Sequence, residues 1–134
     1  MTIENNKERI KLRLWHYKLI NKLPRQQLLG QHRECCALRG KGWGKKHSTV
    51  NYIFSYDKEK LVAYHYMIME EMLNRGYNIE EKWLDITYRG KILGYDNTIL
   101  GNLKDYSGIY FEHNISYMRE CIDNLKNKGI TLAK

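Results

Sequence analysis

The sequence predicts an all-α protein: a compact single domain of three main helices joined by long irregular loops. Three segments, at residues 25–39, 58–75 and 115–128, carry apolar residues at helical spacing. Signals for β-strands are weak, and residues 50–54 give the best of them. The 134 residues are 43% hydrophobic, which is enough for one core and argues against disorder. Packing three amphipathic helices together is the natural way to bury their apolar faces.

The first helix is predicted over residues 25–39, and Pro24 stands where proline suits a first helical turn. Gly40 is expected to end it. At 100° per residue the apolar residues form one arc, made of Leu28, Leu29, His32, Cys35 and Cys36. The opposite, polar face holds Gln26, Gln27, Gly30, Gln31, Arg33, Glu34 and Ala37.

The second helix is predicted over residues 58–75, with Asp57 as its N-cap and Gly76 as its terminator. Its apolar face is broad, which indicates the central helix of the fold, and consists of Leu61, Val62, His65, Ile68, Met69, Met72 and Leu73. Residues 77–110 are predicted to be irregular, with short helical turns at 80–85. The third helix is predicted over residues 115–128, between the cap Asn114 and the terminator Gly129. Its apolar stripe comprises Ile115, Met118, Cys121, Ile122 and Leu125.

Positive charge is concentrated in the first third of the chain. Residues 1–47 carry 12 Lys and Arg but only three acids, whereas the rest is nearly balanced, for a net charge of +8 overall. Such asymmetry predicts a partner that bears phosphates, and therefore a nucleic acid. A basic surface kept for solubility is the alternative, although an even spread of charge would serve that purpose better.

Several other classes of protein are disfavoured. Cys35 and Cys36 are adjacent, a spacing that seldom supports a disulfide or a zinc site, so the cysteines are predicted to be small buried hydrophobes in the reducing cytoplasm. The five histidines lack ligand spacing, and His32 and His65 are interpreted as core residues. We therefore expect no metal and no other cofactor. No apolar run approaches the roughly 18–20 residues of a membrane span, and no signal-peptide pattern opens the chain.

Glu34 is the acid in the middle of this basic segment. It lies on the polar helix face, four residues after Gly30. Because glycine costs a helix about 1 kcal/mol relative to alanine, a close approach of another molecule would explain its presence there. Glu34 would then stabilise a developing cation or move a proton at a sugar carbon, and the surrounding cations would lower its pKa. The alternative is helix packing at Gly30 with Glu34 solvated or paired to Arg33 or Arg13.

The loop 40–47, with the sequence GKGWGKKH, is rich in glycine and lysine. It does not match the nucleotide-binding loop G-x-x-x-x-G-K-[ST], because its spacing is short and Lys46 replaces Ser/Thr. We interpret it as a clamp for DNA phosphates, with Trp43 stacking on bases or wedging between them. The alternative is a surface turn whose Trp43 fills a gap in the core.

Two stretches of the first third resemble a known family. Arg13-Leu-Trp-His16 and the run from Leu23 to Gly40, LPRQQLLGQHRECCALRG, resemble the pyrimidine-dimer DNA glycosylases, also called phage-type endonuclease V. Supporting segments follow in the same order, NRGYNI at 74–79 and YSGIYFEHN at 106–114, so that the resemblance covers about residues 12–129. It divides the chain into a polar N-terminal extension, residues 1–11, and a glycosylase-like helical domain, residues 12–134.

The resemblance implies a fold, a reaction and several roles. The family is a compact all-α domain that acts on UV-damaged DNA as a combined glycosylase and abasic-site lyase. A free N-terminal amine attacks the sugar carbon of the damaged nucleotide and forms a Schiff base, without a metal. A nucleotide is flipped out of the duplex. The family's catalytic glutamate matches Glu34, and the arginine before it, expected to hold DNA, matches Arg33.

The chain departs from the family at the attacking amine and at its C-terminus. In the family the amine lies about 21 residues before the glutamate, a position that Arg13 occupies here inside the chain. Three alternatives for the attacking amine are open: the amine of Thr2 after removal of Met1, the side chain of Lys11, or the N-terminus left by a start at Leu12 read from a TTG or CTG codon. The family's aromatic C-terminal tail also lacks a counterpart in the final residues 131–134, TLAK.

The sequence thus predicts a monomeric, cytoplasmic DNA repair enzyme that binds double-stranded, damaged DNA. The alternative functions are a non-catalytic DNA- or RNA-binding module on the same scaffold, and a protein whose basic segment binds an acidic partner. The candidate catalytic residues are Glu34, Thr2, Lys11 and Arg13. The candidate DNA-binding residues are Arg13, Arg33, Gln27, Gln31, Arg39, Lys41, Trp43, Lys45, Lys46 and His113.

Overall fold

The computed structural model describes residues 13–45, 49–98 and 107–132. In these ranges it contains three α-helices, α2 (Arg25–Arg39), α3 (Lys58–Asn74) and α4 (Ile115–Asn127). Three short 3-10 helices accompany them, η1 (Tyr17–Lys22), η2 (Asn51–Ser55) and η3 (Glu81–Leu84). The described part of the chain has no β-strand and only one isolated bridge, between Tyr88 and Tyr95. The predicted all-α architecture is therefore confirmed.

The helix ends follow the local signals in the sequence. Asn114 caps α4 as predicted, since its side-chain oxygen accepts a hydrogen bond from the backbone N–H of Tyr117 at 2.9 Å. Asp57 occupies the N-cap position of α3, but its side chain makes no capping hydrogen bond. Gly76 and Gly129 follow α3 and α4 with φ of +81° and +82°, a backbone conformation that side chains with a Cβ disfavour.

The weak strand signal at residues 50–54 does not correspond to a strand, and one helical element was not predicted. Residues 50–54 do not form a strand, because η2 turns there and buries Ile53 in the core. The helix η1 was not predicted, and its buried side chains Leu19 and Ile20 tie the N-terminal part of the described chain to the core. The predicted helical turns near 80–85 are confirmed by η3.

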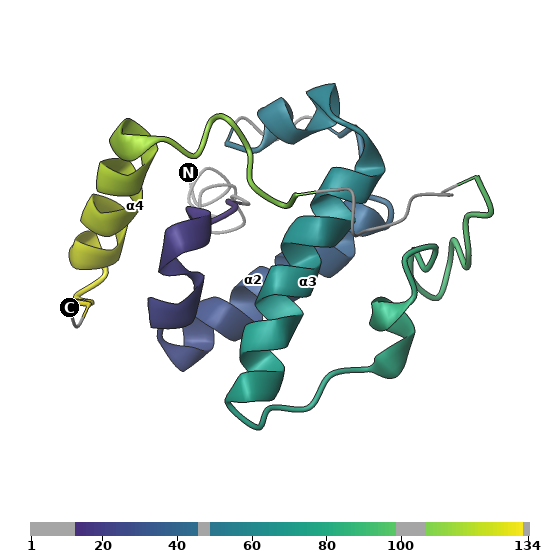
Figure 1. Ribbon diagram of the computed structural model, residues 1–134, viewed down its shortest axis with the longest axis horizontal. Coiled ribbons are helices and arrows are strands. Elements are labelled where there is room, and N and C mark those ends of the chain that lie inside the picture. The colour runs from purple at the N-terminus through teal and green to yellow at the C-terminus, as the bar shows by residue number, and fades with distance from the viewer. Residues whose placement is uncertain (1–12, 46–48, 99–106, 133–134) are drawn as a thin grey trace, which may run out of the picture.

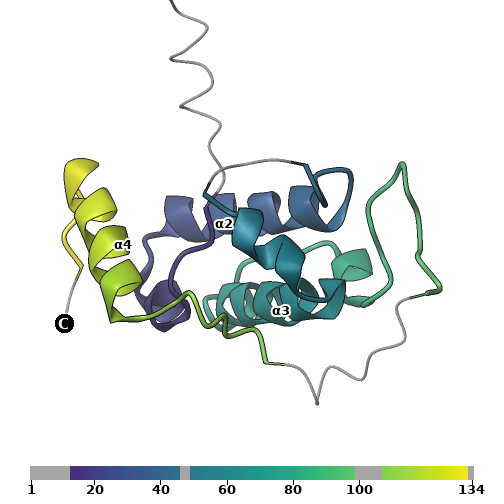
Figure 2. The ribbon, with the colours of Figure 1, turned by 90° about the horizontal axis from the view of Figure 1, so that it is seen from above.

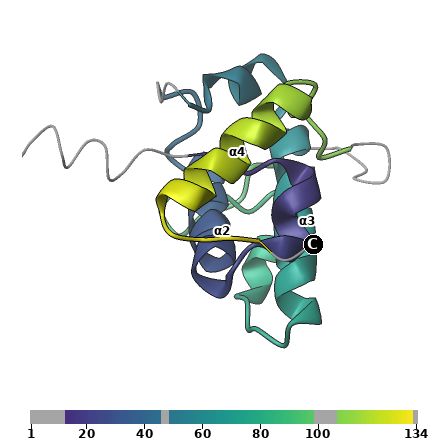
Figure 3. The ribbon, with the colours of Figure 1, turned by 90° about the vertical axis from the view of Figure 1, so that its left-hand side faces the viewer.

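The core forms around α3, the central helix. Helices α2 and α3 lie against each other, as Figures 1 and 2 show, and η1 lies between this pair and α4. Helix α4 crosses one end of the molecule (Figure 3). Gly108 allows the chain that leads into α4 to run against α3, because a Cβ at this position would lie 2.6 Å from the Cα of Tyr64.

For three residues the observed burial is the opposite of the predicted burial. Leu73 and Ile115 were expected in the core, yet they are 51% and 74% exposed, and each stands at a helix end. Gln31 was expected on the polar, exposed face of α2, and it is fully buried. The chain at residues 13–15 covers this face, so Gln31 lies between two elements rather than in solvent.

Candidate active site

Gln31 is the centre of a buried hydrogen-bond network. Its Oε1 accepts hydrogen bonds from the backbone N–H of Trp15 at 2.6 Å and the hydroxyl of Tyr64 at 2.8 Å. Its Nε2 donates to the backbone oxygen of Arg13 at 2.6 Å and to Oε1 of Glu34 at 2.8 Å. All four hydrogen-bonding positions of the amide are therefore used. The network fixes Glu34 beside the chain at Arg13.

Two tyrosines hold the same segment from the other helices. The hydroxyl of Tyr64 on α3 has one proton, which it shares between Oε1 of Gln31 and the backbone oxygen of Trp15, 2.7 Å away. Tyr117 of α4 donates to the backbone oxygen of Leu14 at 2.5 Å. Residues 13–15 are thus attached to all three α-helices. The backbone next to Glu34 is held from several sides, as a precise site requires.

The carboxyl group of Glu34 is partly buried, and burial raises its pKa to about 7. The positive charges of Lys128, Arg33 and Arg13 and the hydrogen bond from Gln31 act in the opposite direction. The expectation that the cations keep this pKa low is therefore wrong, because loss of water around the carboxylate outweighs them. A carboxyl group with this pKa both donates and accepts protons at neutral pH.

Glu34 makes no salt bridge with any other described residue, which removes the structural alternative of a pair with Arg33 or Arg13. The guanidinium of Arg13 lies 3.6 Å from Glu120 and 5.7 Å from the centre of the Trp15 ring. Arg33 is exposed. The two arginines therefore flank the carboxyl group without neutralising it.

Gly30 does not serve helix packing. A Cβ at this position would meet only the guanidinium of Arg33, at 3.8 Å, so the space beside the glycine is open. The patch of bare backbone on α2 is therefore accessible next to the polar side of Glu34. Of the two explanations for the glycine, helix packing is thus disfavoured, and approach by another molecule is favoured.

We expect Gly30→Ala to raise the free energy of unfolding by about 1 kcal/mol, because alanine is the better helix former and the space is open. Urea denaturation measures this change. If the glycine is kept for an approaching DNA backbone, the same variant binds duplex DNA more weakly in a titration at fixed salt. A loss of stability would mean that the site is packed after all.

The structure divides the other predicted DNA-binding residues into two groups. Arg33, Lys41 and Lys45 are exposed, and Gln27 and Arg13 are partly so. The predicted DNA-binding residue Lys46 lies outside the described residues, as do the candidate catalytic residues Thr2 and Lys11.

Three of the residues predicted to contact DNA are buried in the structure. Arg39 is 4% exposed, and its guanidinium donates to the backbone oxygens of residues 83, 85 and 88. Gln31 is occupied as described above. His113 is 5% exposed and lies 2.7 Å from the hydroxyl of Tyr52, and burial lowers its pKa to about 3. These polar side chains are used to hold the fold together.

Trp43 packs on the protein itself. Its ring meets Phe54 edge to face, with 4.9 Å between ring centres, and the side chain lies against the core. This favours the alternative in which Trp43 fills a gap, over stacking on bases. Gly42 makes the tight turn before it possible, because a Cβ there would lie 2.8 Å from the backbone oxygen of Ala37.

Comparison with known proteins can now be set beside this geometry. The family model for pyrimidine dimer DNA glycosylases matches residues 12–85, more than half of the chain. The chain belongs to the pyrimidine dimer DNA glycosylase family. No curated protein and no solved structure matches it. The match includes α2, Glu34 and the segment at Arg13, which the network of Gln31 brings together.

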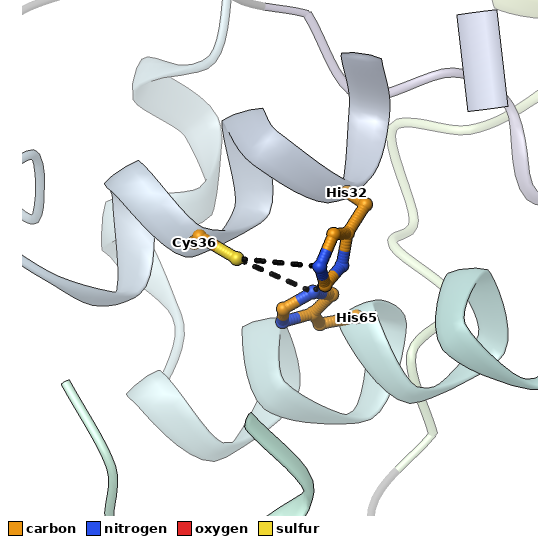
Figure 4. A group of neighbouring side chains, drawn as sticks. All are labelled: His32, Cys36 and His65. Atoms are coloured by element: carbon orange, nitrogen blue, oxygen red, sulfur yellow. Dashed lines mark hydrogen bonds between the residues drawn. The ribbon is translucent and has the colours of Figure 1, made fainter. Parts of the chain in front are cut away.

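This member of the pyrimidine dimer DNA glycosylase family also has a cluster of two histidines and a cysteine between α2 and α3. His32 and Cys36 lie one turn apart on α2, and His65 of α3 meets them (Figure 4). Their candidate ligand atoms all lie within 4.8 Å of one another. Sequence spacing missed this group because its third member comes from another helix.

Hydrogen bonding accounts for this cluster without a metal. Arginine only donates, so Nδ1 of His65, 3.0 Å from the guanidinium of Arg39, must be an acceptor. The proton of His65 then lies on Nε2 and is donated to Nδ1 of His32 at 2.8 Å, while Nε2 of His32 faces the sulfur of Cys36 at 3.8 Å. Burial lowers the pKa of both histidines, which favours these neutral forms. In a metal-binding histidine, the ring nitrogen that does not bind the metal usually donates its proton to an acceptor. In His65, Nδ1 instead faces the cationic guanidinium of Arg39, which is a donor.

Within the described ranges, none of the helices has both the length and the apolar character needed to cross a bilayer.

Two polar neighbours of Glu34 have roles that helix periodicity does not predict, Gln31 and Lys128. Gln31 stands three residues before Glu34, a helical spacing that brings the two side chains together, but its burial depends on other segments. Lys128 acts on Glu34 from another helix, and no sequence signal points to it.

The raised pKa of Glu34 predicts a dependence of stability on pH. The unfolded chain releases this proton near pH 4.5, whereas the folded chain keeps it to about pH 7. The folded state therefore binds more protons between these values, and the group's contribution to stability falls as the pH rises from about 4.5 to about 7. At pH 8 the loss reaches about 3 kcal/mol at most.

Glu34→Gln removes this loss. We expect the variant to be more stable than the native protein at pH 8, and equally stable near pH 4, in thermal or urea denaturation. Glu70→Gln, an exposed change on α3, is the control and is expected to leave the difference between the two pH values unchanged. Equal stabilities of native and Glu34→Gln protein at pH 8 would contradict the buried carboxyl group.

Proposed function

We propose that this protein is a DNA repair glycosylase and abasic-site lyase that acts on pyrimidine dimers or a related lesion through a Schiff base. The observation that carries the proposal is Glu34: a partly buried carboxyl group with a pKa of about 7, held by Gln31 beside residue 13. This is the place where the family resemblance expects an attacking amine. Membership of the family supports DNA as the substrate.

The chemistry needs one amine and one group that gives and takes protons. The amine nitrogen bonds to C1′ of the damaged nucleotide while the bond from C1′ to the base breaks, and the base leaves with the electron pair and takes up a proton. The nitrogen then loses its proton and its lone pair opens the sugar. O4′ leaves C1′ with its electron pair and takes the proton of Glu34, so that C1′ and nitrogen form the iminium.

Glu34 is now a carboxylate and is poised for the lyase step. It takes a proton from C2′, the electron pair of that bond moves toward the iminium, and the C3′–O bond then breaks with its pair on the phosphate. Water hydrolyses the remaining iminium and frees the amine. One carboxyl group thus serves both steps because its pKa lies close to neutral pH.

Exposed cations on and after α2 supply the contacts with phosphates. Arg33 is adjacent to Glu34, and Lys41 and Lys45 follow the helix. Such contacts make binding depend on salt, with a slope that reports the number of phosphates neutralised. If the basic segment instead binds an acidic protein, we expect no salt-dependent binding of duplex DNA.

The test uses the full chain with a UV-irradiated duplex and a duplex that contains one abasic site. We expect strand cleavage of both, and borohydride is expected to trap a covalent adduct between protein and DNA. The absence of both adduct and cleavage would overturn the enzyme proposal. A non-catalytic DNA-binding module would then remain, an alternative favoured by the position of Arg13 inside the chain, where its backbone nitrogen is part of a peptide bond.

A further inference from the structure

The amine required by the proposed function has a candidate among the described residues. Two of the three cations that act on Glu34, Arg13 and Arg33, carry guanidinium groups, which stay protonated and do not form Schiff bases. The third is a lysine. A role for this lysine rests on the proposed function, whose first step needs an amine that attacks C1′ of the nucleotide.

Lys128 ends α4 and extends over the segment that Gln31 holds. Its Nζ lies 5.6 Å from the centre of the Trp15 ring, and the guanidinium of Arg13 lies 5.7 Å from the same ring. The backbone N–H of Trp15 is bonded to the amide of Gln31, whose other end is bonded to Glu34. Lys128 is thereby connected to Glu34 through one aromatic ring and one side chain.

Electrostatics agree with this placement. Of the charges that lower the pKa of Glu34, that of Lys128 has the largest effect, ahead of Arg33 and Arg13. The side chain of Lys128 is exposed and makes no salt bridge with another described residue. Its amine therefore lies over the segment that Gln31 joins to Glu34, and it is open to a substrate.

We propose that Lys128 is the nucleophile, the amine that forms the Schiff base with C1′ of the damaged or abasic nucleotide. Lysine amines form Schiff bases with carbonyl groups in many enzymes. This role would replace the N-terminal amine, which the family resemblance places at residue 13. Trp15 and Gln31 act here as positioning residues.

On an abasic site, in its open aldehyde form, the step balances as follows. The ammonium of Lys128 first gives one proton to water. The neutral nitrogen then bonds to C1′, and the carbonyl π pair moves to oxygen, which takes the proton of Glu34. The resulting alcohol leaves as water after a proton moves from nitrogen to oxygen, and C1′ and nitrogen form the double bond of the iminium. Borohydride delivers a hydride to C1′ of this iminium and makes the bond permanent.

The test traps the full-length protein on an abasic duplex with borohydride, digests the adduct and locates the modified residue by mass spectrometry. We expect the mass of the reduced sugar remnant on Lys128. Lys128→Arg keeps the positive charge and removes the amine. It is expected to lose trapping and strand cleavage to background while it binds duplex DNA within about threefold of the native protein.

Lys126→Arg is the matched control, since this exposed lysine lies on the same end of α4. It is expected to retain both trapping and cleavage. Because Lys128 is exposed, a thermal melt is expected to show Lys128→Arg folded as the native protein.

The outcomes separate this inference from the proposed function. An adduct on Thr2, Lys11 or another amine, with Lys128→Arg still active, would overturn the role of Lys128 and leave the glycosylase and lyase in place. No adduct and no cleavage by the native protein would overturn both. Weaker DNA binding by Lys128→Arg with trapping retained would make Lys128 a phosphate contact and also overturn its role as nucleophile.

Discussion

Glu34→Gln is expected to lower the rate of strand cleavage at abasic sites by about 100- to 10,000-fold, because glutamine neither donates nor accepts the proton that the two chemical steps transfer. The side chain keeps its size, and its amide oxygen still accepts the hydrogen bond from Gln31. Binding to duplex DNA is therefore expected to change little. Single-turnover cleavage and a binding titration measure the two effects separately.

The native protein provides an internal check through the pH profile of the proposed cleavage. With a pKa of about 7 for Glu34, the cleavage rate is expected to change near neutral pH, and this inflection disappears in Glu34→Gln. Glu120→Gln is the control, since Glu120 is an acid beside Arg13 that the proposed mechanism does not use. Full cleavage by Glu34→Gln would remove Glu34 from the mechanism.

Gln31→Leu is expected to lower the free energy of unfolding by about 3 kcal/mol or more. Leucine occupies a similar volume but leaves the backbone N–H of Trp15 and the backbone oxygen of Arg13 without their partner in a buried position. Urea denaturation measures the loss. Gln26→Leu, on the exposed side of the same helix, is expected to change stability by less than about 0.5 kcal/mol.

Gln31→Leu also has a consequence for activity. The hydrogen bond from Gln31 lowers the pKa of Glu34, so its removal is expected to move the inflection of the pH profile upward. A variant as stable as the native protein, with an unchanged profile, would contradict the role of Gln31 as the link between Glu34 and the chain at Arg13.

The predicted helices came from signals that act over a few residues. Apolar spacing, the cap at Asn114 and glycine after each helix are local properties, and they located α2, α3 and α4 to within one residue. The weak strand signal at residues 50–54 comes from β-branched and aromatic side chains that suit a strand, whereas packing selected a short helix that buries Ile53.

The candidate site was predictable only in part, and the resemblance supplied Glu34 more firmly than the helical pattern did. Arg39 shows why the pattern fails for long polar side chains. A basic residue near a helix end is typical of a phosphate contact, yet the loop that contains residues 83, 85 and 88 folds over Arg39, whose guanidinium donates three hydrogen bonds to backbone oxygens of that loop. No local signal shows which loop will cover a side chain.

The sequence by itself determined the class of fold, the three helices and the excess of positive charge before residue 48, and it predicted Glu34 as the candidate catalytic residue. Only the tertiary structure decided that Gln31 is buried, that the pKa of Glu34 is raised rather than lowered, and that Lys128 lies over the ring of Trp15. The physical reason is that helix periodicity and net charge are sums over neighbouring residues. Burial and the pKa of one carboxyl group instead depend on which distant segments exclude water from it.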